Sequence, residues 1–301
     1  MTDILFSIVI PAYNASESIK TTLDCVAAQT YKNYEVIIVD DKSNDAMQLE
    51  QVVRSPRYAD LNIKLELSQQ KLNGAGARNR GIELATGDFI SFLDADDEWR
   101  EDKLQEVVKQ IAMLEAAGKQ RYIIFSQVNI HQDGAFLKVM PMQPVAATET
   151  VAEYLFGCYG FIQTSTIVLK REYAEEIRFD ERYIRHQDYD FCIRADKLGY
   201  EFIMISQPLA TYHLVTSFGS RHKGESVKYS LFWLDSMQQH LTSRDVHTYK
   251  AYKLPLRYKM DGKSLQASLS FARYFFLTNK DNRAYFINRL KEKVRQRLGS
   301  K

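Results

Sequence analysis

The chain has 301 residues, of which 45% are hydrophobic and 26% charged, and its formal net charge is +2. This length can hold one sizeable α/β domain and a smaller appendage, and the composition is that of an ordinary globular protein. No stretch approaches the ~20 apolar residues of a membrane span, and the apolar run 4–10 is too short for a secretory leader. The three cysteines are widely spaced, which argues against a disulfide framework or a zinc site. We therefore expect a cytoplasmic protein.

Short apolar segments alternate with helical patterns in the first half of the chain. Continuous apolar runs are typical of strands buried on both faces, and their alternation with helices predicts a parallel sheet covered by helices. Ligands of such sheets bind at the carboxyl ends of the strands. This rule brings Tyr13, Asp41 and the acidic residues after Leu93 to one rim, although they lie far apart in the sequence. The predicted strands are residues 7–10, 34–39, 63–67 and 89–93.

The loop after the first strand is Pro11-Ala12-Tyr13-Asn14. Asn14 followed by Glu17 resembles a capping box, which predicts that a helix begins here. Its apolar face consists of Ile19, Leu23 and Val26.

The stretch 88–104, DFISFLDADDEWREDKL, combines a buried strand, an acidic turn and the start of a helix. Because side chains alternate along an extended segment, Asp94 and Asp96 should point the same way, and two like charges are costly unless a cation neutralises them. Carboxylates suit Mg²⁺ or Mn²⁺, whose coordination shell substrate phosphates can complete. The alternative is an acidic surface turn that caps the next helix, and the motif by itself favours neither interpretation.

Residues 72–81, LNGAGARNRG, are a glycine-rich helix start. The glycines do not fit the dinucleotide spacing G-x-G-x-x-G, and the Gly-Lys-Ser/Thr ending of a phosphate loop is absent. Free amides together with Arg78 and Arg80 make a generic anion site. In the alternative, the small residues allow close packing of the helix on the sheet while the arginines are solvated.

In their order and spacing, the motifs PAYN, DDKSND, NGAGARNRG and FLDADDEW resemble the nucleotide-sugar-binding half of the inverting family-two glycosyltransferases of bacterial polysaccharide assembly. The resemblance covers residues 5–215 and implies the A-type fold, a mostly parallel, Rossmann-like sheet with flanking helices. It also implies a metal-dependent, inverting transfer from a nucleotide diphosphate sugar, mainly a UDP-sugar, with Mn²⁺ or Mg²⁺ as the cofactor. Glu101 departs from the pattern, because the family often has proline there.

The resemblance assigns the base pocket to the first two motifs. Pro11, Ala12 and Tyr13 would line this pocket, and Asp41 would accept a hydrogen bond from the base.

The next two motifs would hold the rest of the donor. Arg78 would lie near the nucleotide or its phosphates, Asp94 near the ribose and Asp96 on the metal. Asp97 would support the loop.

The element His186-Gln187-Asp188-Tyr189-Asp190 opens a predicted helix and resembles the family's Glu-Asp-x-Asp motif. In that motif the first Asp, here Asp188, is the catalytic base, and an inverting transfer needs a base near the acceptor hydroxyl. Gln187 stands where Glu is frequent, which changes a local charge. The alternative for Asp188 and Asp190 is capping of the helix N-terminus. We favour catalysis for Asp188 and a structural role for Asp190.

Weaker candidates complete the site. Gln163 and Thr164 approach the acceptor in the resemblance, although strand polarity explains them equally well. Trp99 could stack on a sugar face or be buried against the sheet. His213 matches a metal-binding histidine of some members, although a lone His at a strand end is more often a hydrogen-bonded structural residue. The loop 215–224 could fold over the diphosphate or be a solvated connection.

From residue 225 onward the chain changes to aromatic-rich helices, so we expect a catalytic domain over 1–224 and a helical extension over 225–301. In the last segment an apolar face is flanked by many Lys and Arg residues, as in an amphipathic helix on an anionic membrane surface. Such a helix would make the protein peripheral on the inner face of the membrane. The alternative is a helix docked on its own domain. The apolar face consists of Phe286, Leu290, Val294 and Leu298.

Three function classes follow. The leading one is a glycosyltransferase whose acceptor is a saccharide, lipid-linked in surface polysaccharide assembly. A sugar nucleotidyltransferase usually has a Gly-rich basic loop where this chain has PAYNASES. A non-catalytic saccharide or lipid-carrier binding protein would not need both Asp96 and Asp188. A nucleic-acid partner is not expected, because basic and base-stacking residues are not interleaved.

Overall fold

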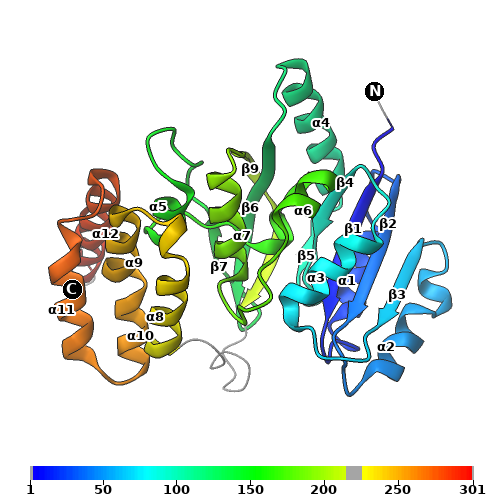
Figure 1. Ribbon diagram of the computed structural model, residues 1–301, viewed down its shortest axis with the longest axis horizontal. Helices are drawn as coiled ribbons and strands as arrows, with labels where there is room; N and C mark the ends of the chain where they lie inside the picture. Colours follow the sequence, from blue (N-terminus) through cyan, green and yellow to red (C-terminus); the bar gives the residue numbers. More distant parts are fainter. Residues whose placement is uncertain (1–2, 215–225, 300–301) are drawn as a thin grey trace. The chain divides into compact units, whose positions relative to one another are not determined.

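The computed structural model describes residues 3–214 and 226–299, so the loop 215–224 lies outside the described residues. The chain divides into two compact units, which Figure 1 shows. Unit 1 contains Met1–Pro144 and Ile162–Thr216, and unit 2 contains Val145–Phe161 and Ser217–Lys301. The segment Val145–Phe161 therefore belongs with the C-terminal helices, which its sequence did not indicate. The predicted boundary between residues 224 and 225 stays a prediction.

The first strands of unit 1 form the predicted parallel sheet. β1 (Phe6–Ala12) pairs in parallel with β2 (Tyr34–Asp40) and with β4 (Phe89–Phe92), and β3 (Ile63–Leu67) pairs in parallel with β2. These strands are apolar because both faces of the sheet are covered, and Ile8, Val9 and Ile10 are fully buried.

The remaining strands make the other half of the sheet mixed. β8 (Val168–Lys170) is antiparallel to β4 and to β6 (Tyr122–Gln132), and β6 is parallel to β9 (Glu201–Leu214). β5 (Glu98–Trp99) pairs with β9, and β7 (Ala135–Met140) pairs with β6. The described residues thus form a nine-stranded sheet in the order β3-β2-β1-β4-β8-β6-β9-β5, with β7 on β6. This confirms the predicted α/β fold with a mostly parallel sheet and flanking helices.

The helices of unit 1 bury one apolar face each. They are α1 (Ile19–Ala27), α2 (Ala46–Val53), α3 (Asn73–Leu84), α4 (Lys103–Ala116), α6 (Arg171–Ile177) and α7 (Gln187–Lys197). The predicted capping box before α1 is wrong. Ser18 precedes this helix without a side-chain cap, and Asn14 adopts a φ of 50°. Its Oδ1 instead accepts a hydrogen bond from the backbone N–H of Asn44 (2.9 Å), a partner that is distant in the sequence.

Helix α3 lies directly on β1 because one of its residues has no side chain. A Cβ atom at Gly81 would lie only 2.3 Å from Cγ1 of Val9. The small residues of the glycine-rich segment therefore do allow the close packing that one of the two interpretations predicted. The other half of that interpretation, solvated arginines, is wrong for Arg78, which is 7% exposed.

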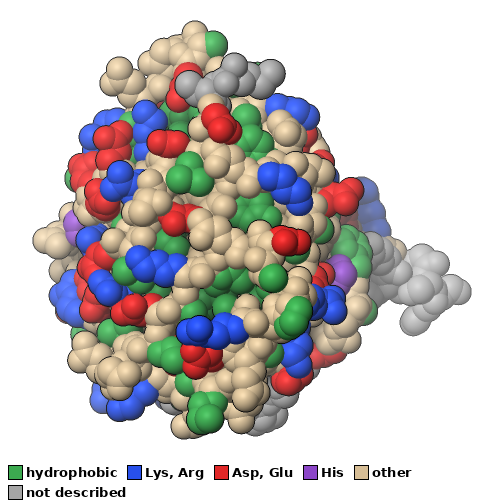
Figure 2. All heavy atoms as spheres, turned by 90° about the vertical axis from the view of Figure 1, so that its right-hand side faces the viewer, with side chains coloured by type: hydrophobic (Ala, Val, Ile, Leu, Met, Phe, Trp, Pro, Cys, Tyr) green, Lys and Arg blue, Asp and Glu red, His purple; other side chains and the backbone are tan. Residues whose placement is uncertain are grey.

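The other arginine of this segment is engaged at the surface. Arg80 forms ion pairs with Glu66 and Glu83 (3.1 Å each), and all three side chains are substantially exposed. On the face of the molecule shown in Figure 2, acidic and basic side chains are likewise interspersed. Exposed ion pairs of this kind contribute at most about 1 kcal/mol each to stability.

The register of the strands sets the position of the predicted rim. Ala12 at the end of β1 is paired with Asp40, and the backbone N–H of Asp41 donates to the carbonyl of Ala12 (2.8 Å). On the other side of β1, the N–H of Leu93 donates to the carbonyl of Val9 (3.0 Å). The carboxyl ends of β1, β2 and β4 therefore meet at one edge of the sheet.

Unit 2 is a set of helices around an aromatic core. The Phe156 ring lies 5.9 Å from that of Trp233 and 5.0 Å from that of Tyr249. Thr150 caps α5 and donates to Asp245 of α9 (2.5 Å), which ties the segment 145–161 to the C-terminal helices. None of the described helices is long and apolar enough to cross a membrane. The helices are α5 (Val151–Phe156), α8 (Val227–Ser236), α9 (Ser243–Tyr252), α10 (Leu254–Met260), α11 (Ser264–Phe275) and α12 (Lys280–Gly299).

Candidate active site

A pocket of about 460 Å³ opens at the rim where β1, β2 and β4 end. The loop after β1, the first turns of α3 and the acidic turn after β4 supply its lining. All seven residues for which the sequence predicted donor binding line this one pocket, while their individual roles stay predictions. They are Pro11, Ala12, Tyr13, Asp41, Arg78, Asp94 and Asp96.

Among the residues that line the pocket is a tyrosine whose ring is covered by a lysine. The Tyr13 side chain is 51% exposed, and Nζ of Lys71 lies 2.9 Å from its ring centroid and 2.6 Å from Oδ2 of Asp41. Oδ1 of Asp41 accepts hydrogen bonds from the backbone N–H groups of Leu72 (2.5 Å) and Asn73 (3.0 Å). Asp41 therefore holds the start of α3, a role that the sequence did not indicate. Only its Oδ2, now paired with Lys71, can turn to a ligand.

A buried arginine lines the pocket. The Arg78 guanidinium donates to Oδ1 of Asp94 (2.5 Å) and to Oε1 of Gln187 (2.8 Å). Gly74 leaves room for this contact, because a Cβ atom there would lie 2.9 Å from the Gln187 oxygen and 3.0 Å from the Arg78 nitrogen. Gln187 also donates to the carbonyl of Tyr183 (2.7 Å), so its amide fixes the position of Arg78. The sequence marked Gln187 only as a change of charge, because its partner lies on another helix.

The acidic turn rests on a buried carboxylate. Asp97 is 1% exposed, and its Oδ2 accepts hydrogen bonds from Ser165 Oγ and Gln163 Nε2 (2.6 Å each). Burial raises the pKa of Asp97 well above its usual range, and the charges of Asp94 and Asp96 raise it further. Asp97 therefore lies beneath the turn, while Asp94 and Asp96 face the pocket.

The two pocket carboxylates fit a divalent cation. Desolvation within the pocket and the charge of Asp94 raise the pKa of Asp96, while His213 and Arg78 lower it. A cation held by Asp94 and Asp96 would remove this repulsion, and carboxylate oxygens are the ligands that Mg²⁺ and Mn²⁺ prefer. Among residues 3–214 and 226–299, no group of three or more His, Cys, Asp or Glu side chains could hold a metal ion.

His213, the second predicted metal ligand, has a protein partner. Its Nε2 lies 2.7 Å from Oε1 of Glu98, and its ring meets that of His131 edge-on at 5.5 Å. This is the hydrogen-bonded state that the sequence analysis gave as the alternative. Nε2 would have to leave Glu98 before it could bind a metal.

The predicted base opens α7 beside the charged groups of the pocket. Asp188 is half-buried, and its Oδ1 accepts a hydrogen bond from the backbone N–H of Tyr189 (2.9 Å). Burial raises the pKa of Asp188 to about 6; Arg78 opposes this shift, and Asp94 adds to it. A carboxylate with such a pKa is a better proton acceptor near neutral pH than an ordinary aspartate.

Asp190, two residues further on, has a different environment. It is fully buried and forms an ion pair with Arg194 (2.7 Å) on the next turn of α7. A buried, paired carboxylate holds structure and has no access to substrate. This agrees with the structural role predicted for Asp190.

The three acceptor candidates do not present free polar or aromatic faces. Trp99 is 4% exposed, and its Nε1 donates to the carbonyl of Ser165 (2.8 Å), so the ring cannot stack on a sugar. Gln163 and Thr164 are 5% and 6% exposed, and the Gln163 amide is used to hold Asp97. Trp99 is therefore buried, as the alternative interpretation had it, and Gln163 supports the acidic turn from below. Contact of Gln163 and Thr164 with an acceptor stays a prediction.

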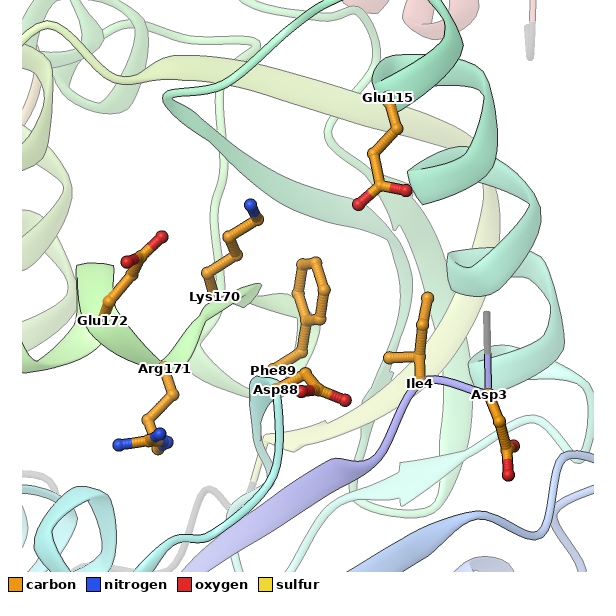
Figure 3. A pocket seen from close by; sticks show the side chains of 8 residues that line it. All are labelled: Asp3, Ile4, Asp88, Phe89, Glu115, Lys170, Arg171 and Glu172. Carbon is orange, nitrogen blue, oxygen red and sulfur yellow. The ribbon is translucent and has the colours of Figure 1, made fainter. Parts of the chain in front are cut away.

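A second cavity, of about 550 Å³, lies at the opposite edge of the sheet, where β1 and β4 begin (Figure 3). In this view Lys170 and Phe89 point into it from below and Glu115 from α4 above. The carboxylate of Asp88 in this cavity accepts a hydrogen bond from the backbone N–H of Leu5 (2.9 Å), so it links the segments just before β1 and β4. Acidic groups outnumber basic ones in its lining, which does not favour a diphosphate. The lining residues are Asp3, Ile4, Asp88, Phe89, Glu115, Lys170, Arg171 and Glu172.

The fold and the rim pocket together define an enzyme of the A-type glycosyltransferase class. The chain belongs to glycosyl transferase family 2, whose family model matches residues 7–177. This confirms the family that the sequence motifs predicted.

Two relatives are similar over much of their length. The chain is 74% identical over 301 residues to the amylovoran biosynthesis glycosyltransferase AmsB of Erwinia amylovora. The aligned region covers 100% of each of the two chains. It is 31% identical over 192 residues to the UDP-Glc:alpha-D-GlcNAc-diphosphoundecaprenol beta-1,3-glucosyltransferase WfgD of Escherichia coli, which covers 63% of this chain and 68% of the relative.

Two solved structures share the fold. S. aureus TarS 1-349 in complex with UDP-GlcNAc has a TM-score of 0.63 at 16% identity and covers 93% of this chain and 83% of that one. The mannosyltransferase PcManGT from Pyrobaculum calidifontis, in complex with GDP-Man and Mn2+, has a TM-score of 0.57 at 19% identity. This alignment covers 96% of this chain and 80% of PcManGT. At these identities the likeness concerns the fold alone.

Proposed function

We propose that this glycosyltransferase transfers a sugar from a UDP-sugar, with inversion and with the help of Mn²⁺ or Mg²⁺, to a lipid-linked saccharide during surface polysaccharide assembly. The observation that carries the proposal is the convergence of one aromatic side chain, one buried arginine and three carboxylates in a single pocket, with a half-buried aspartate of raised pKa beside them.

The aromatic and charged side chains that line the pocket suit a nucleotide diphosphate. Tyr13 offers an exposed ring on which a base can stack once Lys71 moves aside, and Oδ2 of Asp41 can then accept from the base. Arg78 brings a positive charge to the centre, where a diphosphate would lie. UDP is preferred because the description of WfgD names UDP-Glc.

Asp94 and Asp96 would hold the metal ion, which supplies positive charge for the departing diphosphate. The protein's own contribution is to hold the acidic turn in place, through the hydrogen bonds of Asp97 with Gln163 and Ser165 and of the Asp94 backbone N–H with Ser165. Arg78 adds a second positive charge near the same leaving group.

Asp188 would take the proton of the acceptor hydroxyl as that oxygen attacks the sugar carbon. In an inverting transfer the attack and the loss of the diphosphate occur in one step, and a base is needed only for the hydroxyl proton. Within the part of the chain that the structure describes, Asp188 forms no ion pair, whereas Asp190 is bound to Arg194.

The acceptor is inferred from the relatives. WfgD acts, by its description, on GlcNAc-diphosphoundecaprenol, and AmsB belongs to the biosynthesis of a polysaccharide. A lipid-linked saccharide is therefore the acceptor class that we propose. The prediction that the protein binds an anionic membrane surface through its last helix stays a prediction.

Replacement of Asp96 tests the donor site directly. Asp96→Ala should weaken UDP binding in the presence of Mn²⁺ and abolish metal-dependent turnover while the protein stays folded, because this exposed carboxylate stabilises the ion rather than the core. Calorimetry with UDP, with and without Mn²⁺, measures the effect, and Asp60→Ala at an exposed turn is the matched control. Unchanged affinity and full turnover in Asp96→Ala would remove Asp96 from the metal site.

A further inference from the structure

We propose that a pocket within unit 2 binds the phosphate end of a single-chain lipid, such as a polyprenyl diphosphate, and so holds the lipid part of the acceptor. The inference rests on the proposed function, because that function supplies the lipid-linked acceptor. It concerns residues that the donor site and the base do not use.

The pocket lies between the segment after α5, the end of α9, α10 and α12, and it has a volume of about 460 Å³. This volume is in the range of small-molecule sites, about 300–1,000 Å³. Its walls are mainly apolar, and three cations stand among them. The lining residues are Gly157, Cys158, Tyr252, Lys253, Leu256, Lys259, Phe286, Arg289 and Leu290.

One wall is held in place by aromatic packing. The Phe286 ring lies 4.9 Å from that of Phe271, 5.6 Å from that of Phe275 and 6.0 Å from that of Tyr252. Phe286 is therefore part of the body of unit 2, and the pocket does not depend on a ligand to form this wall.

The mouth of the pocket exposes apolar surface. Leu256 on α10 and Leu290 on α12 both line the pocket, and each is 54% exposed. Apolar side chains that remain exposed around a cavity are typical of a binding site, because burial of this surface by a ligand is favourable.

The cations define the polar end of the ligand. Lys253, Lys259 and Arg289 line the same pocket as Cys158. The charges of Lys253 and Arg289 lower the pKa of the Cys158 thiol, which burial raises to about 11. Lys259 and Arg289 form no ion pair with any carboxylate of the described residues. Positive charge that its own fold does not neutralise favours an anionic group, and a diphosphate carries the most charge on a lipid of this type.

An amphiphile with one anionic head and one hydrocarbon chain satisfies both features. A free phosphate would leave the apolar walls uncovered. A flat membrane surface would require the apolar face of α12 to point outward, but Phe286, the first residue of the predicted membrane face, packs inward on α9 and α11. The side chains of Val294 and Leu298 lie outside the described residues.

Binding of farnesyl diphosphate to the full-length protein tests the inference. Calorimetry should show binding of farnesyl diphosphate, with pyrophosphate and farnesol at least about tenfold weaker, because each offers only half of the contacts. Equal binding of pyrophosphate would mean an anion site without lipid. Binding only to phosphatidylglycerol vesicles would mean a membrane surface. Either result, or no binding at all, overturns the inference.

Matched variants locate the site. Arg289→Gln and Leu290→Asn should each weaken farnesyl diphosphate binding by about tenfold. Lys291→Gln and Ile287→Asn change the same kinds of exposed side chain on the same helix outside the pocket, and each should alter binding less than about twofold. Equal losses in both pairs would overturn the assignment. Thermal melts of all four variants exclude unfolding as the cause.

UDP binding to the unmodified protein separates this inference from the proposed function. If UDP binds and farnesyl diphosphate does not, the lipid site alone is wrong. If farnesyl diphosphate binds and UDP does not, the proposed donor is wrong and the lipid site stands.

Discussion

Replacement of Asp188 by asparagine should slow turnover strongly and at the same time stabilise the protein. The side chain keeps its shape and loses its ability to take a proton, so turnover should fall by about 10²–10⁴-fold, the usual contribution of a positioned base. Donor affinity should hardly change. A residue that only caps the helix would show no loss of turnover, because asparagine caps a helix about as well as aspartate does.

The gain in stability follows from the pKa of Asp188. Because burial raises this pKa from 3.8 to about 6, the folded state favours the protonated form. The carboxylate therefore contributes nothing unfavourable at low pH and destabilises the fold progressively as the pH rises from the unfolded pKa to the folded one. The full shift corresponds to about 3 kcal/mol, or about 1–3 kcal/mol once the partial exposure of the side chain is considered. Asp188→Asn should recover this free energy at pH 8 and little of it at pH 4.

The assays are urea unfolding at pH 4 and pH 8 and turnover across the pH range. In the unmodified enzyme a base with a pKa of about 6 is about 90% ionised at pH 7 and about 9% at pH 5, so kcat/KM should fall about tenfold between them. Asp190→Asn is the control on the same turn of α7. It breaks a buried ion pair and should destabilise by about 3–5 kcal/mol. A loss of stability in Asp188→Asn at pH 8, or a parallel loss of UDP affinity, would refute the assignment as base.

One substitution tests the packing of α3 on β1, and another tests the residue that covers Tyr13 in the donor pocket. Gly81→Ala should destabilise by about 1–3 kcal/mol in urea unfolding, because its Cβ would lie 2.3 Å from Val9, whereas Gly76→Ala on the same helix meets its nearest neighbour at 3.1 Å and should be close to neutral. Equal effects would contradict the close packing of α3 on β1. Lys71→Ala should strengthen uridine binding by up to about fivefold in calorimetry, since an exposed ion pair over Tyr13 no longer has to be broken. Lys64→Ala on β3 is the control, and weaker uridine binding in Lys71→Ala would mean that Lys71 contacts the nucleoside itself.

The sequence predicted the rim of the sheet because that rim follows from strand register. Apolar runs that end in Tyr13, Asp41 and Asp94 identify parallel strands, and parallel strands bring their carboxyl ends together. The convergence of the seven predicted donor residues in one pocket is a consequence of this geometry.

The side chains that hold the rim could not be predicted in the same way. Gln163 was expected at the acceptor, but its partner Asp97 lies on a different strand end, and Gln187 contacts Arg78 across two helices. For Trp99 the sequence allowed either stacking on a sugar or burial against the sheet. The hydrogen bond of its Nε1 to the carbonyl of Ser165 shows that the ring is buried. Such contacts depend on tertiary packing, which periodicity and local motifs do not encode.

The last helix shows the same limit. The spacing of its apolar residues correctly predicts a helix, and α12 spans Lys280–Gly299. The pattern is the same whether the apolar face meets a membrane or the rest of the unit. The ring contacts of Phe286 with Tyr252 and Phe271 decide this for the first residue of the face.

The central claim is glycosyl transfer from a UDP-sugar, and the phosphorus-containing product tests it most directly. The purified protein is incubated with a panel of UDP-sugars, Mn²⁺ and a GlcNAc-diphospho-lipid acceptor, and the reaction is followed by phosphorus NMR. Our account predicts that UDP accumulates in step with a lengthened lipid-linked saccharide, and that the transferred sugar has the opposite anomeric configuration to the donor. Release of pyrophosphate would instead indicate nucleotidyl transfer. If every UDP-sugar of the panel remained intact with this acceptor, the account would be contradicted.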